Sequence, residues 1–185
     1  MLYHILTIEE KQNKKFLQRA TKEVRFLPKG CIIDGKELNM KELSVLLSDM
    51  KRTMHAASGI GLSANQIGIN GKFFIAQVPD DKGKPAWYAV FNPMIEKASN
   101  RIEGKEEGCL SIPLTYGNVP RADRVVLTGF DKNGKPVKHK AWGLLAQVFQ
   151  HEVDHLNGKL FIDRTKDIHR VPESDRLRER KEHAQ

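Results

Sequence analysis

The chain has 185 residues and a formal net charge of +8, and 39% of its residues are hydrophobic. This length suits one domain with its own core, and the composition excludes a disordered chain. No apolar run approaches the roughly 18 residues of a membrane span, and two cysteines, Cys31 and Cys109, are too few for a secreted disulfide scaffold. We therefore predict a soluble, cytoplasmic, single-domain protein over residues 1–185, with no membrane contact.

The first third of the chain predicts helices. Residues 8–24 are polar and typical of a short surface helix. Glu42 follows Asn39 by three positions, which is the spacing of a capping box at a helix start. Behind it, apolar residues recur at helical spacing, so we predict an amphipathic helix of about 18 residues that stops at Ser58. The apolar residues of this helix are Leu43, Leu46, Leu47, Met50, Met54 and Ala57.

The middle of the chain predicts short strands, because it is rich in β-branched and aromatic residues. The predicted strands are residues 72–78, 86–91, 125–130 and 137–142. Turn-forming residues lie between them at 80–83 and 131–134.

After Gly143 the apolar period becomes helical, and Gly158 ends it. The apolar residues cover more than one face, so this helix is predicted to be buried nearly all round. The sequence therefore predicts an α+β fold, in which short antiparallel strands pack around a central buried helix.

The strongest local pattern lies inside that last helix, in His151-Glu152-Val153-Asp154-His155. Residues four apart share a helix face, so His151 and His155 can offer two imidazole nitrogens to one ion. Glu152 can reach a water beside that ion. The alternative is a pair of core histidines beside a salt bridge, but a buried Glu152 would then need a partner to stay ionised. A metal site is the preferred interpretation.

Two histidines do not complete a catalytic metal site, which usually has three protein ligands. The third histidine of the extended metalloprotease motif is absent, because Phe161 stands at its position. A downstream glutamate, Glu173, is one remaining candidate. The thiolate of Cys109 is the other, although a lone cysteine is more often a small buried hydrophobe.

Three segments taken in order resemble the peptide deformylase family. The family pattern is G-x-G-L-A-A-x-Q, then E-G-C-L-S, then Q-H-E-x-D-H-L-x-G. This chain matches it at residues 59–66, 107–111 and 150–158, with Ser63 in place of the first alanine as the only substitution. The resemblance extends over about residues 40–165 and leaves residues 166–185 as a charged tail.

The resemblance implies a metal-dependent hydrolase that removes the formyl group from N-formylmethionyl peptides of nascent chains and releases formate. Cys109, His151 and His155 would bind one divalent metal ion, with water as the fourth ligand. The family usually works with iron(II), and this ligand set also suits zinc, nickel or cobalt.

The resemblance also implies the roles of the other site residues. Glu152 would be the general base, and Gln66 with the backbone N–H of Leu110 would stabilise the oxygen of the tetrahedral intermediate. The positions assigned to substrate binding are Ile60, Gly61, Gly108, Tyr116, Leu144 and Gln147.

Two of these positions depart from the family. Tyr116 stands where many bacterial relatives have an arginine, and Gln147 stands where the family commonly has an aliphatic residue. Both positions lie near the methionine pocket, so the departures concern the choice of substrate side chain and leave the metal chemistry unchanged.

Other classes of function remain as alternatives. One is a peptidase with Glu173 as the third ligand. Another is a ribosome- or RNA-binding module with a structural metal, but structural sites are normally closed by four protein ligands and only three are evident. A third is a catalytically silent relative, which the presence of every expected catalytic residue disfavours.

The basic charge does not by itself indicate nucleic-acid readout. The 31 Lys and Arg exceed the 23 Asp and Glu, but no aromatic residues alternate with them as a base-stacking surface requires. We expect a solubilising surface and no sequence-specific nucleic-acid binding. A transient ribosome contact, including one through residues 176–185, stays compatible with this charge, although a solvated terminus is preferred.

Overall fold

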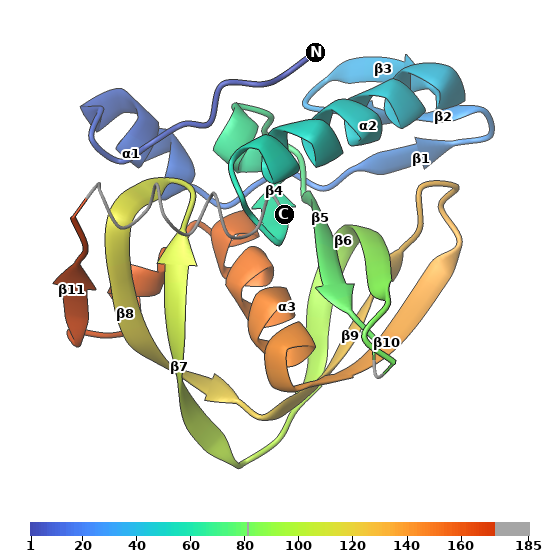
Figure 1. The fold of residues 1–185 in the computed structure, drawn as a ribbon. Helices are drawn as coiled ribbons and strands as arrows, with labels where there is room; N and C mark the ends of the chain where they lie inside the picture. The colour runs from blue at the N-terminus through green and yellow to red at the C-terminus, as the bar shows by residue number, and fades with distance from the viewer. Residues whose placement is uncertain (81, 173–185) are drawn as a thin grey trace.

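The computed structural model describes residues 1–80 and 82–172, and arranges them as antiparallel sheets around one central helix (Figure 1). The helical elements are α1 (Lys11–Leu17), α2 (Met40–Ala56), α3 (Gly143–Leu156) and the 3-10 helices η1 (Ala64–Ile67) and η2 (Phe161–Asp163). The strands are β1 (Arg25–Leu27), β2 (Gly30–Ile33), β3 (Lys36–Asn39), β4 (Gly61–Ser63), β5 (Phe73–Pro79), β6 (Pro85–Ala98), β7 (Ile102–Cys109), β8 (Ile112–Ala122), β9 (Arg124–Phe130), β10 (Pro136–Trp142) and β11 (Ile168–Arg170). The α+β class is confirmed.

The amino-terminal helices follow their sequence signals. The Asn39 side chain accepts the N–H groups of Lys41 and Glu42, and Glu42 Oε2 accepts the Asn39 N–H at 2.9 Å. This confirms the capping box at the start of α2, whose apolar face packs into a core shared with β2 and β5. The helix predicted over residues 8–24 is real but shorter, because only Lys11–Leu17 is helical.

The four strands predicted in the middle of the chain are confirmed. They form one sheet with β4, in the order β10-β9-β6-β5-β4. The predicted turn at 131–134 closes with the Gly134 N–H bonded to the Asp131 carbonyl at 3.0 Å. Asp81, in the other predicted turn, lies outside the described residues.

The second long sheet was not predicted. It has the order β11-β8-β7, and β7 carries the second motif at its end. The sequence of β7, IEGKEEGC, is polar and contains two glycines, so its β-propensity is low. The extended form of β7 therefore depends on pairing with β8. β11 also pairs with β8, so this sheet extends past residue 165 into the expected tail.

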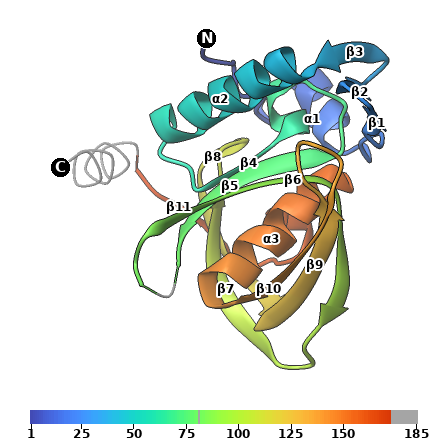
Figure 2. The same ribbon diagram turned by 90° about the vertical axis from the view of Figure 1, so that its right-hand side faces the viewer.

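The central helix α3 lies between the two long sheets (Figure 1), and Figure 2 shows α2 and α3 on opposite sides of β4 and β5. Its second half is buried, including residues 152–156. The prediction of burial nearly all round is wrong for the first turn, where Leu144 is 47% exposed, because this turn lies at the mouth of a cleft. Gly143 has a φ of +57°, a left-handed conformation that glycine adopts without strain as the chain turns from β10 into the helix. Within the described residues, every helix is too short or too polar to cross a lipid bilayer.

Candidate metal centre

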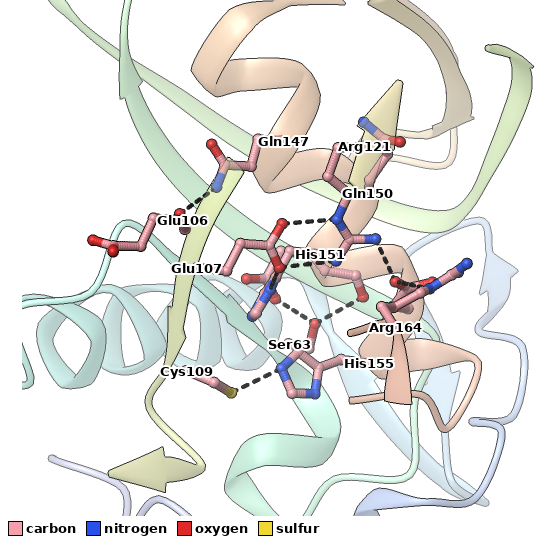
Figure 3. Close-up of polar contacts among 12 residues, drawn as sticks. Ser63, Glu106, Glu107, Cys109, Arg121, Gln147, Gln150, His151, His155 and Arg164 are labelled. Atoms are coloured by element: carbon pink, nitrogen blue, oxygen red, sulfur yellow. Dashed lines mark hydrogen bonds and ion pairs between the residues drawn. The ribbon is translucent and has the colours of Figure 1, made fainter. Parts of the chain in front are cut away.

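Three side chains that are candidate metal ligands converge between α3 and the end of β7 (Figure 3). The ligand atoms of Cys109, His151 and His155 all lie within 4.8 Å of one another. Cys109 Sγ is 3.1 Å from His155 Nε2. The helix places the two histidines one turn apart on one face, and the last residue of β7, Cys109, brings in the thiol.

The donor set suits a divalent cation. Ligand bonds of about 2.3 Å to sulfur and about 2.0–2.1 Å to nitrogen place the two atoms about 3.5 Å apart in a tetrahedral site. The 3.1 Å between Cys109 Sγ and His155 Nε2 is close to that separation. His151 Nδ1 is bonded to Glu107 Oε2 at 2.8 Å, which leaves its Nε2 for an ion. The residues present therefore fit one metal ion.

The imidazoles differ in electrostatic setting. Burial lowers the pKa of His155 well below its usual value, and the neighbouring His151 and Arg121 lower it further. A neutral imidazole is the form that binds metal. Burial acts to lower the pKa of His151 as well, but Cys109 and Glu107 outweigh it and raise that pKa well above the usual value. Metal binding at His151 Nε2 must therefore displace a proton.

Behind His151 lies a chain of ion pairs, of which Glu107, Arg121 and Asp154 are buried. Arg121 donates two hydrogen bonds to Glu107, from Nε to Oε1 at 2.7 Å and from Nη2 to Oε2 at 2.9 Å. Its Nη1 also donates to Asp154 Oδ2 at 2.5 Å. Arg164 Nε donates to the same oxygen of Asp154 at 2.9 Å. Burial acts to raise the pKa of Glu107, but the bonds to Arg121 and His151 outweigh it and lower that pKa to about 2.

Glu152, which follows His151 on α3, has an environment opposite to that of Glu107. Glu152 is 3% exposed, and burial raises the pKa of its carboxyl to about 7, although the charge of His151 and a hydrogen bond from Ser63 act against the rise. Ser63 Oγ donates to Glu152 Oε2 at 2.5 Å. The other oxygen, Oε1, lies against Gly61, where a Cβ atom would be only 2.3 Å away. A carboxyl group with this pKa can take up and return a proton at neutral pH.

Gln66 is held beside the thiol. Its Oε1 accepts the Ser63 N–H at 2.9 Å, which turns its Nε2 towards Ser111 Oγ at 3.1 Å and Cys109 Sγ at 3.7 Å. Leu110 follows Cys109 in the turn between β7 and β8 and lines the cleft in front of the centre. Gln66 Nε2 thus lies beside a candidate metal ligand, and Leu110 lies at the cleft.

The cleft has a volume of about 320 Å³, and two of the candidate ligands, Cys109 and His151, line it. All six residues assigned to substrate binding line it: Ile60, Gly61, Gly108, Tyr116, Leu144 and Gln147. The Tyr116 ring stacks on the ring of His169 in β11, with centroids 6.0 Å apart. Gln147 Nε2 donates to the Glu106 carbonyl at 2.7 Å and so links α3 to β7 beside the cleft.

Two strand edges border the same cleft, because β4 and β7 are the last strands of their sheets. The Ile60 carbonyl accepts the Gln77 N–H of β5 at 2.8 Å, so the backbone groups of Gly61 point away from β5. The Glu106 carbonyl faces Gln147, so the backbone groups of Gly108, two residues on, also point away from β8. The Ile60 carbonyl is therefore already bonded within the sheet. On this edge the backbone groups of Gly61, and not that carbonyl, are free to pair with a substrate.

Sequence reasoning missed the residues that support the ligands. Asp154 lies inside the histidine pattern and Glu107 opens the cysteine motif, but neither was assigned a partner. The signal was the presence of acidic residues at buried positions, which need a buried cation. Nothing in the local sequence indicated that this cation is Arg121, with Arg164 beyond it.

Comparisons with known proteins point to one family. The family model described as polypeptide deformylase matches residues 9–171, a longer stretch than the motifs alone indicated. The chain is 41% identical to the peptide deformylase of Azotobacter vinelandii over 142 residues, which is 76% of this chain and 81% of that protein. It is 37% identical to the peptide deformylase of Roseiflexus castenholzii over 90% of both chains.

Solved structures agree. A probable peptide deformylase from Synechococcus phage S-SSM7 is 34% identical, with a TM-score of 0.74 over 88% of this chain and 99% of that one. A peptide deformylase from Acinetobacter baumannii, solved with Met-Ala-Ser bound, is 29% identical, with a TM-score of 0.75 over 89% of this chain and 99% of that one.

The close approach of Gly61 to Glu152 gives a first prediction. Gly61→Ala should push the carboxyl of Glu152 out of place and lower kcat at least about tenfold, because small displacements of reacting groups are costly. Steady-state kinetics on a formyl-methionyl peptide measures this. Gly104→Ala is the matched control, since its Cβ would lie 2.4 Å from Asn118 Oδ1, a side chain on the surface that can move away. A Gly61→Ala enzyme with the parent's kcat would contradict the geometry.

The pKa of Glu107 gives a second prediction. Because folding lowers this pKa from 4.5 to about 2, its stabilisation is complete above pH 4.5 and is lost as the pH falls towards 2. The contribution is of the order of 3 kcal/mol, from about 1.4 kcal/mol per pKa unit. Urea unfolding of the metal-free protein between pH 5 and pH 2 should show a flatter pH dependence for Glu107→Gln than for the parent. Equal slopes would contradict the assignment.

Proposed function

The chain belongs to the peptide deformylase family, and from that premise we propose how its own residues carry out the reaction. It is a metal-dependent hydrolase that removes the formyl group from the N-terminal formylmethionine of new polypeptides. The observation that supports the proposed roles most strongly is the pairing of the Cys109, His151 and His155 cluster with a buried carboxyl of pKa about 7 on the adjacent residue, Glu152.

Cys109, His151 and His155 would hold the metal ion. When bound, the ion supplies Lewis acidity, which makes water a strong nucleophile at neutral pH. We infer iron(II) as the ion used in the cell, with zinc, nickel or cobalt as substitutes that the same donors accept. Glu107 supports this arrangement because its bond to Nδ1 fixes the ring of His151.

Glu152 is the general base in this proposal. Its Oε1 lies on the Gly61 side, at the cleft, and takes the proton of the attacking water. The same carboxyl then delivers that proton to the nitrogen of the departing amine, so formate and a free amino terminus result. A pKa near neutral suits both transfers, because the group is neither too weak a base nor too weak an acid.

Gln66 and the N–H of Leu110 would stabilise the charge that develops on the formyl oxygen. Gln66 Nε2 is already held at the centre by bonds from both ends of its amide. A donor fixed before the reaction needs no reorganisation during it, and the loss of one such donor typically costs about 10²–10³ in rate.

The substrate would lie extended between the two sheet edges. Backbone groups of Gly61 and Gly108 face the cleft and can pair with a peptide strand. The first side chain must lie beside the metal centre, because the formyl group is attached to the amino nitrogen of that residue. Leu144, Gln147 and Tyr116 line the space there. The Acinetobacter relative with Met-Ala-Ser bound supports a methionyl peptide in this place.

The setting in the cell follows from the substrate. Formylated nascent chains emerge from ribosomes, so we place the enzyme in the cytoplasm as a single domain, with at most transient ribosome contact. The tail residues 176–185 lie outside the described residues. Glu173, the third ligand of the alternative peptidase, lies outside them too.

One substitution separates the proposed function from that peptidase. Cys109→Ser should lose both bound metal and formate release, because an alcohol is a far weaker metal ligand than a thiolate, while Glu173→Ala should retain both. Metal content and formate release from a formyl-Met-Ala-Ser peptide are measured on protein prepared without oxygen and loaded with iron(II). Metal retained by Cys109→Ser and lost by Glu173→Ala would contradict the proposal.

A matched variant tests the base in the same assay. Glu152→Ala should bind metal as the parent does and lose at least about 10²-fold in kcat, the range for a general base. Cys31→Ala is the control for Cys109→Ser, because Cys31 is a cysteine that the site does not include. Full turnover by Glu152→Ala would remove this residue from its role.

A further inference from the structure

Ser63 is hydrogen-bonded to both side chains that are proposed to act on the substrate, Glu152 and Gln66. Its hydroxyl donates to Glu152 Oε2 at 2.5 Å, and its backbone N–H donates to Gln66 Oε1 at 2.9 Å. The residue is completely buried at the end of β4, so solvent does not compete for either bond. It is also the one position at which the chain departs from the family pattern in the first motif.

Glu152 depends on this hydroxyl for its orientation. Within residues 1–80 and 82–172, Ser63 supplies the side-chain hydrogen bond to this carboxyl group. Ser63 Oγ also lies 3.2 Å from the backbone carbonyl oxygen of Glu152, so the hydroxyl contacts both the side chain and the main chain of this residue. A buried carboxyl without such a donor could rotate about its last side-chain bond, since terminal torsions of glutamate are broad.

The bond makes the two oxygens of Glu152 inequivalent. Oε2 is engaged by Ser63, while Oε1 lies over Gly61 at the wall of the cleft. We propose that Ser63 is a positioning residue for the hydrolysis: its hydroxyl holds Oε2 so that Oε1 faces the reacting water, while its N–H orients the amide of Gln66 towards the substrate oxygen. This inference rests on the proposed roles of Glu152 and Gln66.

The role divides between side chain and backbone, which makes it testable. Substitution of the side chain removes the bond to Glu152 and leaves the N–H bond to Gln66 in place. Ser63→Ala should fold, because alanine is the residue of the family pattern at this position. Its effect should appear in kcat and not in KM, because Ser63 does not line the cleft and the bond serves a group that acts after binding.

The experiment compares the parent, Ser63→Ala and Ser63→Thr, each loaded with the same metal, on formyl-Met-Ala-Ser. We expect Ser63→Ala to lower kcat about threefold to tenfold with KM unchanged, the size that one buried hydrogen bond supports. Ser63→Thr, which retains the hydroxyl, should restore kcat to within about twofold. Metal affinity, measured by competition with a chelator, should be the same in all three.

A second measurement tests the role of Ser63 even if the threonine of Ser63→Thr does not fit the buried position. Adding Ser63→Ala to Glu152→Gln should change the residual rate less than about twofold, because a residue that acts through Glu152 has nothing left to position. Unchanged kcat in Ser63→Ala, or a further large loss in the Glu152→Gln background, would overturn the role of Ser63. An inactive parent would instead overturn the proposed roles of Glu152 and Gln66 and the inference with them, so the two failures are distinguishable.

Discussion

The ionic chain from His151 through the buried Glu107, Arg121 and Asp154 to Arg164 at the surface is the constraint on which the rest of the structure depends. It ties β7 to β8 and both strands to α3, and it continues to the segment after η2. Buried charges are costly unless each is paired and hydrogen-bonded. These side chains meet that condition only when β7, β8 and α3 are in register. The same pairing holds a proposed metal ligand in one orientation.

Glu107 and Glu152 show how one fold separates two carboxyl groups at a single centre. Glu107 receives a guanidinium fork and an imidazole, so its pKa falls to about 2 and it stays ionised. Glu152 is as deeply buried but receives one hydroxyl, so its pKa rises to about 7. The first group is therefore suited to hold a ligand and the second to move a proton. Glu107 is hydrogen-bonded to His151 and Glu152 follows His151 in sequence, but only Glu107 has cationic partners that outweigh the effect of burial on its pKa.

Sequence reasoning reached the elements with strong local signals. The capping box at Asn39, the strands rich in aromatic residues and the histidine pair at helical spacing each carry their information within a few residues. β7 carries no such signal, because its polar, glycine-containing sequence is extended only through its pairing with β8. The partners of Arg121 were also out of reach, since Glu107 and Asp154 lie 14 and 33 residues away in the chain. The exposure of Leu144 depends on the cleft, which exists only once both sheets are assembled.

The most direct test of this account is the metal affinity of an Arg121→Lys variant, measured by competition with a chelator on folded protein. Lysine keeps the charge but cannot grip Glu107 with a planar fork and reach Asp154 at the same time. We expect zinc or cobalt to bind this variant about 10- to 100-fold more weakly, the usual cost of losing support behind a metal-bound histidine. Arg124→Lys, at an arginine on the surface, should bind as the parent does. A folded Arg121→Lys protein with the parent's affinity would contradict the claim that the ionic chain positions His151.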